Sequence, residues 1–196
     1  MALSSDGNTM IQFKNGKIGY CEKTENGWTE LEYFPDNINK GSWTGDAMLT
    51  SDGNALIFAS ERPGSFNFTA IGLQGYHASN NYASDIYISL REDDTWGEPI
   101  NIGPSINTIY SERSPFLHPD MKTLYFSSDG HGGLGKYDVF KSTRLSDTCW
   151  NCWTEPINLG KEINTEENDW GYTISTDGSK AYFAKYNDKK KNKIYW

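Results

Sequence analysis

The sequence has no apolar run long enough to cross a membrane as a helix, which takes about 18 residues or more. It opens with Met1-Ala2-Leu3 and has neither the basic nor the apolar region of a signal peptide. This fits either a cytoplasmic protein or a segment of a longer exported one. Three cysteines are too few for a disulfide scaffold. With 18 basic against 26 acidic residues and a net charge of −8, no nucleic-acid partner is expected.

Catalytic and cofactor motifs are also missing. The three histidines show no spacing of a metal triad, and no Ser-His-Asp or Cys-His arrangement stands out. The glycine-rich stretch 128–138 lacks the Gly-Lys-Ser/Thr ending and the following helix of a phosphate loop. No cofactor is therefore expected, apart from the calcium considered below.

What the sequence does contain is aromatic residues, 14% of the chain, and 19 glycines. This combination suits short half-buried strands joined by polar turns. Four segments repeat one plan, an apolar strand, a turn built on Asp and a second strand rich in aromatics: Leu3–Phe13, Ala47–Ser60, Pro115–Ser128 and Tyr172–Lys185. Asp-Gly between two such strands predicts a hairpin. Met121 replaces Gly in the third copy, so we expect a different turn geometry there.

A third strand follows each pair, at Lys17–Cys21, Asp85–Ser89, Asp138–Ser142 and Lys193–Trp196. A fourth strand follows in three copies, at Gly27–Leu31, Thr95–Gly103 and Cys152–Gly160. Four-stranded units that repeat about every 40–50 residues are typical of β-propeller blades. The predicted fold is all-β: a single propeller domain, whole or partial, over 1–196, with units at roughly 2–40, 41–108, 109–166 and 167–196.

Several phrases resemble the WD-repeat-like propeller repeats of the TolB type: Ser51-Asp-Gly53, Asp85-Ile-Tyr87, Phe126–Gly130 and Trp153–Gly160. They are similar, more narrowly, to the propeller modules beside OmpA-like domains in envelope proteins of Bacteroidetes-type bacteria. The resemblance implies a periplasmic or envelope-associated protein and a parent propeller of more than four blades. It does not imply one activity, because fold does not fix function.

The loop Glu61–Ser84 is the main departure from the repeat. It carries aromatic and amide side chains that suit a sugar or a peptide, and the candidate ligand-binding residues in it are Phe66, Phe68, Tyr76, His77 and Tyr82. The alternative is a loop that folds over its own aromatics. Arg113 and Trp170, in the connections between blades, are further candidates at the mouth of the channel.

Acidic residues cluster near the same connections. Glu112 and Asp169 occupy equivalent positions, with Asp46 and Glu167 nearby, and paired carboxylates can hydrolyse glycosidic bonds. Nothing in the sequence gives two of these carboxylates distinct environments, so a glycoside hydrolase is the alternative and a non-catalytic role is favoured. Arg113 is alternatively the ion-pair partner of a neighbouring acid.

Asp129, His131 and Asp138 are candidates for holding a cation, and their oxygen ligands suit calcium better than zinc. Asp85 recurs at the position of Asp138, which favours a structural role for both in bonding loop N–H groups. Cys149 and Cys152 form a C-x-x-C in a hairpin, where a local disulfide is expected in an oxidising compartment and two free thiols otherwise. Cys21 is expected to be a buried strand residue.

These patterns favour a binding or scaffold module of the bacterial cell envelope, with a protein or glycan partner held on one loop face. Two alternatives remain, a propeller glycoside hydrolase and an assembly element whose last blade is completed by another chain.

Overall fold

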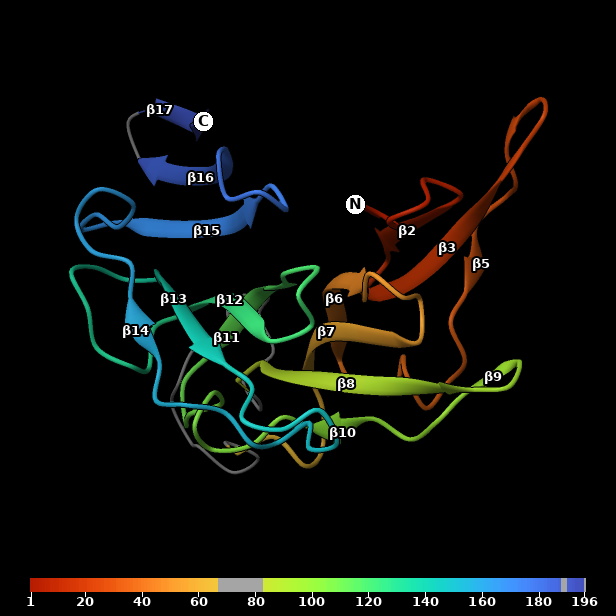
Figure 1. Cartoon of the computed structure of the whole chain (residues 1–196), viewed down its shortest axis with the longest axis horizontal. Coiled ribbons are helices and arrows are strands. Elements are labelled where there is room, and N and C mark those ends of the chain that lie inside the picture. The colour runs from red at the N-terminus through yellow and green to blue at the C-terminus, as the bar shows by residue number, and fades with distance from the viewer. Residues whose placement is uncertain (67–82, 188–189, 196) are drawn as a thin grey trace.

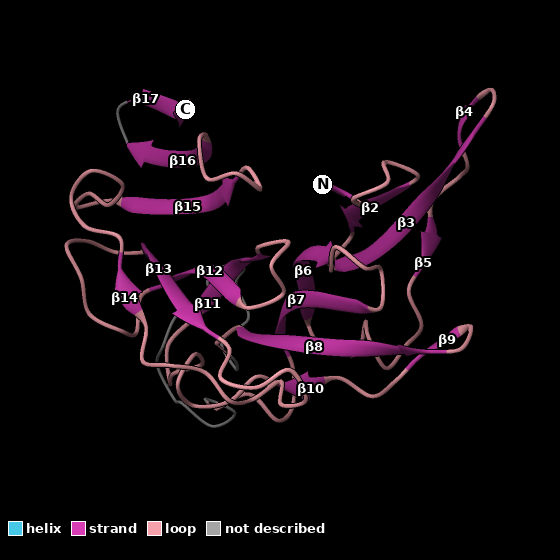
Figure 2. Cartoon of the chain, viewed as in Figure 1, coloured by secondary structure: helices cyan, strands magenta, loops and turns pink. Residues whose placement is uncertain are grey.

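The computed structural model describes residues 1–66, 83–187 and 190–195 of the chain. Within these ranges every regular element is a β-strand (Figure 2). The described residues therefore include no helix that could span a membrane.

The strands form four antiparallel sheets, which we call blades 1 to 4. Blade 1 contains β1 (Ala2–Leu3), β2 (Thr9–Lys14), β3 (Lys17–Thr24), β4 (Gly27–Trp28) and β5 (Glu32–Tyr33). Blade 2 contains β6 (Trp43–Leu49), β7 (Ala55–Glu61), β8 (Asp85–Glu92), β9 (Thr95–Trp96) and β10 (Ile100–Asn101). Blade 3 contains β11 (Glu112–Leu117), β12 (Thr123–Ser128), β13 (Asp138–Thr143) and β14 (Ile157–Asn158). Blade 4 contains β15 (Asn168–Ile174), β16 (Ala181–Asn187) and β17 (Lys190–Tyr195).

The four blades follow one another around an arc, with β2 and β17 at its two ends (Figure 1). The inner strand of each later blade packs on the blade before it: β6 on β1, β2 and β3, β11 on β6, β7 and β8, and β15 on β11, β12 and β13. The all-β prediction of four-stranded propeller blades is confirmed, and the described chain is a partial β-propeller.

The outer strands are shorter than predicted. The nine-residue strands expected at Thr95–Gly103 and Cys152–Gly160 are not continuous. Thr95–Gly103, for example, divides into β9, which extends the hairpin with β8, and β10, which pairs with the middle of β8. Pro99 lies between the two pieces and has no N–H to donate to a ladder. Blade 1 divides in the same way, into β4 and β5, without a proline.

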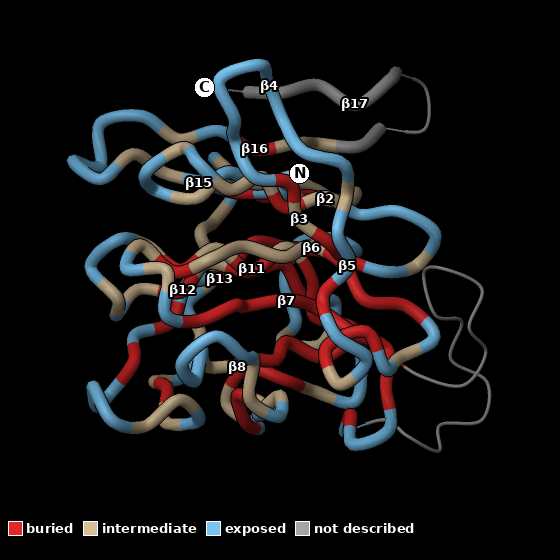
Figure 3. The backbone as a smooth tube through the Cα atoms, turned by 90° about the vertical axis from the view of Figure 1, so that its right-hand side faces the viewer, coloured by how far each residue is buried: buried red, intermediate tan, exposed pale blue. Residues whose placement is uncertain are grey.

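Buried apolar side chains gather between neighbouring blades. One cluster joins blades 1 and 2 through Ile11, Phe34 and Leu56. A larger one joins blades 2 and 3, and a third joins blades 3 and 4 around Val139 and Tyr172. Figure 3 shows buried backbone along β7 and β8, whereas the hairpin that carries β4 is exposed. Since burying a large apolar side chain is worth about 1.5–3 kcal/mol, these junctions hold the arc together.

A buried asparagine closes each of the first three blades. Asn39, Asn107 and Asn164 each accept a hydrogen bond from a backbone N–H of the third strand and donate one to the carbonyl of the same residue. The residues so bound are Ile18, Ile86 and Val139, at N···O distances of 2.8–2.9 Å. We call this contact the asparagine clamp. The clamp gives the third-strand N–H a partner beyond the end of the short outer strand, while the carbonyl also accepts a bond from the backbone N–H of Phe34, Ile102 or Leu159.

The hairpin at Met121 does not have the different geometry expected from its sequence. Met121 has a φ of 61°, close to the 72° of Gly53, and its N–H donates to the His118 carbonyl at 2.9 Å, as Gly53 does to Thr50. The Asp120 carboxylate holds the turn by accepting bonds from the Lys122 and Thr123 N–H groups. A methionine therefore adopts the left-handed conformation that usually favours glycine.

Candidate functional site

The inner strands of blades 2, 3 and 4 carry a β-bulge at one shared position. The register of each inner strand against its neighbour shifts within a short segment, 45–48, 113–116 or 170–173. One residue of each bulge is left-handed, with φ values of 49° for Asp46, 49° for Ser114 and 66° for Gly171. A bulge redirects side chains locally, and here it turns the side chain of Asp46 towards the next blade.

Asp46 and Arg113 form an ion pair between blades 2 and 3. The Arg113 Nε donates to Asp46 Oδ2 at 2.8 Å, and the Ser114 N–H donates to the same oxygen at 3.1 Å. The guanidinium also lies over the Trp43 ring, 4.1 Å from its centroid. Arg113 thus pairs with a neighbouring acid, the alternative that its sequence left open. The pair fixes the bulges of two blades against each other.

A cavity of about 480 Å³ lies beside this pair, between the inner strands of all four blades. Its lining is mostly apolar and aromatic, with Asp46 and Arg113 as its charged groups: Met1, Ala2, Ile11, Gln12, Phe13, Ile18, Trp43, Asp46, Ala47, Met48, Arg113, Ser114, Pro115, Phe116, Gly171, Tyr172 and Thr173. We call it the inner cavity. Its size falls within the range of ligand sites, about 300–1,000 Å³.

The loop between β12 and β13 lies on the same face as the connections between blades. The Asp129 carboxylate accepts a bond from the Ser111 N–H at 2.7 Å, and His131 Nε2 lies 2.7 Å from the Ile106 carbonyl oxygen. On the other side, the Lys136 ammonium pairs with the Glu167 carboxylate at 2.7 Å. These contacts tie the loop, through Asp129, His131 and Lys136, to the connection before blade 3 (Ile106 and Ser111) and to the connection after it (Glu167). We call the surface that these six residues form the loop face.

Glu112 and Asp169 do not line an opening, contrary to the position expected from the sequence. Both are buried and close the connection that precedes their own strand. Glu112 accepts bonds from the Thr108 N–H and hydroxyl and from the Ser128 hydroxyl, at 2.8–2.9 Å. Asp169 accepts the same pair of bonds from Thr165. Burial raises the pKa of both carboxyls, that of Glu112 well above its ordinary value.

Asp85 and Asp138 have the structural role that their recurrence suggested. Asp85 Oδ2 accepts bonds from the Phe66 N–H and the Asn101 amide, and Asp138 Oδ2 accepts them from Leu134 and Asn158. Burial raises the pKa of Asp85 to about 7. The other oxygen of each carboxylate is buried without a hydrogen-bond partner.

The candidate cation ligands do not form a metal site in the described part of the chain. No group of three or more His, Cys, Asp or Glu side chains there could hold an ion. His131 packs against the rings of Phe126 and Phe140, at centroid distances of 5.7 and 5.4 Å. The Asp129 carboxylate bonds a loop N–H, as described above.

The aromatic loop is described only at its ends. Phe66 is 47% exposed, and its backbone N–H is the donor to Asp85. Phe68, Tyr76, His77 and Tyr82 lie outside the described residues. Trp170 lies next to the bulge of blade 4, with its ring 6.2 Å from that of Tyr137.

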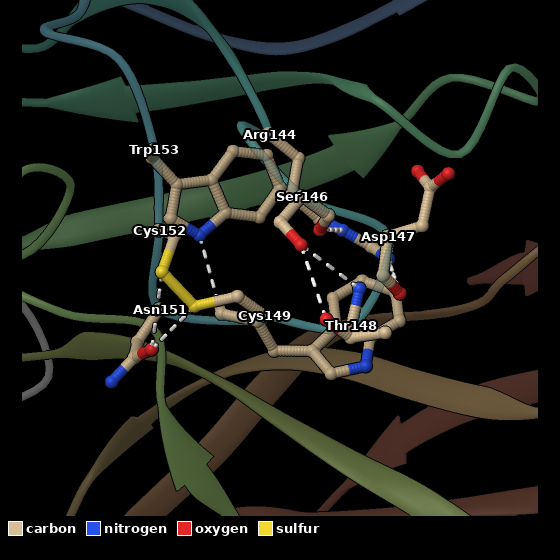
Figure 4. Close-up of a disulfide and its surroundings, with 9 residues drawn as sticks. Arg144, Ser146, Asp147, Thr148, Cys149, Asn151, Cys152 and Trp153 are labelled. Carbon is tan, nitrogen blue, oxygen red and sulfur yellow. Dashed lines mark hydrogen bonds between the residues drawn. A yellow bond between two sulfur atoms is a disulfide. The ribbon is translucent and has the colours of Figure 1, made fainter.

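Cys149 and Cys152 form a disulfide (Figure 4), the pairing that the hairpin spacing predicted for an oxidising compartment. The Trp153 indole N–H donates to the Trp150 carbonyl at 2.8 Å, and the Arg144 guanidinium lies 3.7 Å from the centroid of the Trp150 ring. Cys21 is a buried free cysteine in β3, also as expected.

Sequence reasoning missed the apolar wall of the inner cavity. Met48, Phe116 and Tyr172 were assigned to inner strands without a role. Each lies one or two residues after the left-handed residue of a bulge, so the bulges would have been the signal. They could not be recognised in the sequence, because two of the three left-handed residues, Asp46 and Ser114, are not glycines.

No protein-family model matches this sequence, and no curated protein matches it. Solved structures do resemble it in fold. TolB from Acinetobacter baumannii is 14% identical with a TM-score of 0.56, over 98% of this chain and 38% of that chain. The endo-arabinase from Bacteroides thetaiotaomicron is 14% identical with a TM-score of 0.53, over 94% and 72%. Hydrazine synthase from Kuenenia stuttgartiensis is 14% identical with a TM-score of 0.50, over 92% and 47%.

The chain thus spans well under half the length of the TolB structure that it resembles. At such low identities the likeness concerns the fold alone, and proteins of different activity share it. The chain has a TolB-type β-propeller fold.

Proposed function

We propose that this chain is a non-catalytic binding module of the bacterial cell envelope, which holds a protein partner in the inner cavity and on the adjoining loop face. The observation that carries the proposal is the inner cavity, to which all four blades contribute. A concave site with an apolar wall and a few fixed polar groups is the usual form of a binding site.

The chemistry of the lining favours a peptide segment over a glycan in this cavity. Met48, Phe116 and Tyr172 offer apolar contact, and Arg113 and Asp46 already neutralise each other. A protein segment with an apolar or aromatic side chain would bury that side chain against this wall.

The hydrolase alternative is less well supported. A glycosidase needs two carboxylates facing the substrate in different environments. Glu112 and Asp169 instead perform one and the same task in two connections, as acceptors for a threonine. Glu112→Gln and Asp169→Asn are expected to lower stability. Loss of turnover on a glycan panel, with the fold intact, would restore the hydrolase.

An envelope location rests on two observations. The disulfide Cys149–Cys152 is of a kind found in oxidising compartments. The repeat phrases also resemble those of envelope propellers. Alkylation of the protein taken directly from its host would test the location, because fully reduced Cys149 and Cys152 would contradict it.

The proposal is tested by placing a photo-crosslinking amino acid at Phe116, in the cavity wall, and in a second protein at Asn26, in the exposed turn between β3 and β4. Exposed to an extract of its host envelope, the first protein is expected to capture a protein that the second does not. Phe116→Arg should prevent co-purification of the same partner. Equal capture at both positions would refute the proposal.

The assembly alternative keeps one observation. Within the described residues β17 pairs only with β16, so its other edge is open to a further strand. Light scattering distinguishes the two ideas, since a monomer at all concentrations counts against pairing of copies through that edge.

A further inference from the structure

A second cavity, of about 490 Å³, lies at the outer side of the junction between blades 1 and 2. We call it the junction pocket. It shares no lining residue with the inner cavity, so its occupant does not depend on the proposed function. Residues of β2, β3, β5, β6 and the hairpin between β8 and β9 contribute to its wall: Thr9, Tyr20, Glu22, Glu32, Tyr33, Phe34, Pro35, Asn37, Leu49, Arg91, Asp94, Thr95 and Trp96.

The next junction, between blades 2 and 3, offers a comparison within the same chain. The asparagine clamps align the two junctions, because Asn39 binds Ile18 as Asn107 binds Ile86. On this alignment Tyr20 corresponds to Ile88 and Glu22 to Leu90. Ile88 and Leu90 belong to the apolar cluster of the second junction or pack against it. The wall that is apolar at the junction of blades 2 and 3 is thus aromatic and acidic at the junction of blades 1 and 2.

The hairpins that cover the two junctions also differ in length. In blade 3 the pair Arg144–Trp153 encloses residues 145–152, whereas in blade 2 the pair Arg91–Trp96 encloses only residues 92–95. The longer hairpin carries Trp150, which packs against the apolar cluster, and the disulfide closes its tip. The shorter hairpin has no counterpart of Trp150. The longer hairpin of blade 3 thus supplies an indole to its junction, whereas the junction with the shorter hairpin of blade 2 contains the junction pocket.

The wall of the junction pocket combines aromatic rings with hydrogen-bonding groups of both kinds. Phe34 lies between Tyr20 and Trp96, at centroid distances of 5.2 and 5.6 Å, and Tyr33 is 43% exposed. The carboxylates of Glu22 and Glu32 are acceptors, while the Arg91 guanidinium, 5.9 Å from the Trp96 centroid, is a donor. Both glutamates are exposed residues that a ligand can reach.

We propose that the junction pocket binds a neutral sugar residue of a glycan, with an apolar sugar face against the Tyr33 ring and its hydroxyls bonded to Glu22, Glu32 and Arg91. Hydroxyl groups both donate and accept, so they satisfy carboxylates and a guanidinium together. An amine would pair with the carboxylates of Glu22, Glu32 and Asp94 and would leave the Arg91 guanidinium without an acceptor, so it is the competing ligand that the experiment must exclude. An aromatic side chain would contact the rings alone and would donate no hydrogen bond to Glu32 or to Glu22, which the Thr9 hydroxyl already reaches at 3.2 Å.

The experiment titrates the whole chain with neutral tetrasaccharides, namely cellotetraose, maltotetraose, arabinotetraose and chitotetraose, and follows binding by NMR and calorimetry. At least one is expected to bind. Tyr33→Ala and Glu22→Gln, both exposed positions, should each weaken that binding about tenfold or more. Phe116→Ala in the inner cavity should leave it unchanged, which separates this site from the one proposed above.

A matched pair of grafts gives a second test. Residues 92–95 are replaced by a copy of 145–152, which is expected to fill the junction pocket and abolish binding. The same graft with its copy of Trp150 changed to alanine should leave part of the space open and retain binding. Thermal unfolding of both grafts checks that they fold.

Tetralysine and an indole peptide are titrated in parallel. Two outcomes would overturn the proposal: no tetrasaccharide binds the folded chain, whether or not tetralysine or the indole peptide does, or tetrasaccharide binding is unaffected by Tyr33→Ala and Glu22→Gln. If the grafts do not fold, the two point variants decide.

Discussion

Asp46 of blade 2 and Arg113 of blade 3 are 67 residues apart in the chain and meet at 2.8 Å, each beside or within a β-bulge. The Arg113 side chain is almost fully buried, whereas that of Asp46 is 27% exposed. Burial therefore costs Arg113 more desolvation free energy than Asp46. The main contribution of the pair is that the Asp46 carboxylate compensates the charge of the buried guanidinium.

The first prediction concerns this pair. Asp46→Asn keeps a residue that tolerates the left-handed backbone and removes only the charge. We expect the free energy of unfolding to fall by about 1–2 kcal/mol. This is less than the loss of a fully buried charged partner would cost, because Asp46 is partly exposed. Urea unfolding measures it. In a double-mutant cycle with Arg113→Met, additive losses would mean that the two side chains do not interact.

The second prediction concerns the asparagine clamp. Asn107→Ala removes the partner of the buried Ile86 N–H and one of the two donors to the Ile86 carbonyl, which keeps the bond from the Ile102 N–H, and we expect a loss of about 1–3 kcal/mol. Asn26→Ala, in an exposed turn, is the control and should change stability by less than about 0.5 kcal/mol. Equal effects of the two substitutions would show that the asparagine clamp does not contribute to the free energy of unfolding.

The third prediction is a pH dependence. The pKa of Asp85 is about 7 in the fold, against 3.8 for an ordinary aspartate, because the carboxyl is buried. Between these values the folded protein holds a proton that the unfolded chain has released. The contribution of Asp85 to the free energy of unfolding is therefore fully present below about pH 4. It is lost as the pH rises to 7, by at most about 1.4 kcal/mol per pH unit.

Asp85→Asn should remove that slope, which unfolding curves at pH 5, 6, 7 and 8 would reveal. Asp177→Asn serves as the control. The pKa of Asp177 is lowered to about 2 by hydrogen bonds from Ser175 and Ser179, so this group titrates below the pH range of the test. An unchanged slope in Asp85→Asn would mean that Asp85 stays ionised in the fold.

The fourth prediction concerns the disulfide. Replacing Cys149 and Cys152 by serine should lower the free energy of unfolding by about 2 kcal/mol, since a cross-link across so short a loop restricts the unfolded chain only slightly. Thermal unfolding with and without reducing agent measures it. The reducing agent should destabilise the natural protein and leave the double variant unchanged.

Much of the fold could be predicted because each blade repeats its strands and turns, so errors in one copy are corrected by the others. The errors that remain concern single residues. Met121 was expected to change a turn because it is not glycine, but the bonds made by Asp120 hold the same turn. Glu112 and Asp169 were placed correctly along the chain, yet alignment does not tell which way a side chain points from a connection.

The sites were harder to predict. Arg113 was a candidate for ligand binding and pairing with an acid was its alternative, but a partner 67 residues away depends on how two bulges face each other. The junction pocket depends on a difference in hairpin length between blades 2 and 3. That difference is visible in the sequence, but its meaning appears only once Trp150 is seen to pack between blades.

The asparagine clamp also bears on how the chain folds. It joins residues 21, 21 and 25 positions apart, always within one blade. Such short separations let a blade close before its neighbours exist, so the clamp favours folding that proceeds one blade at a time. We expect the clamped third strands to acquire hydrogen-exchange protection early in refolding, ahead of the pairing between Asp46 and Arg113 that requires two finished blades.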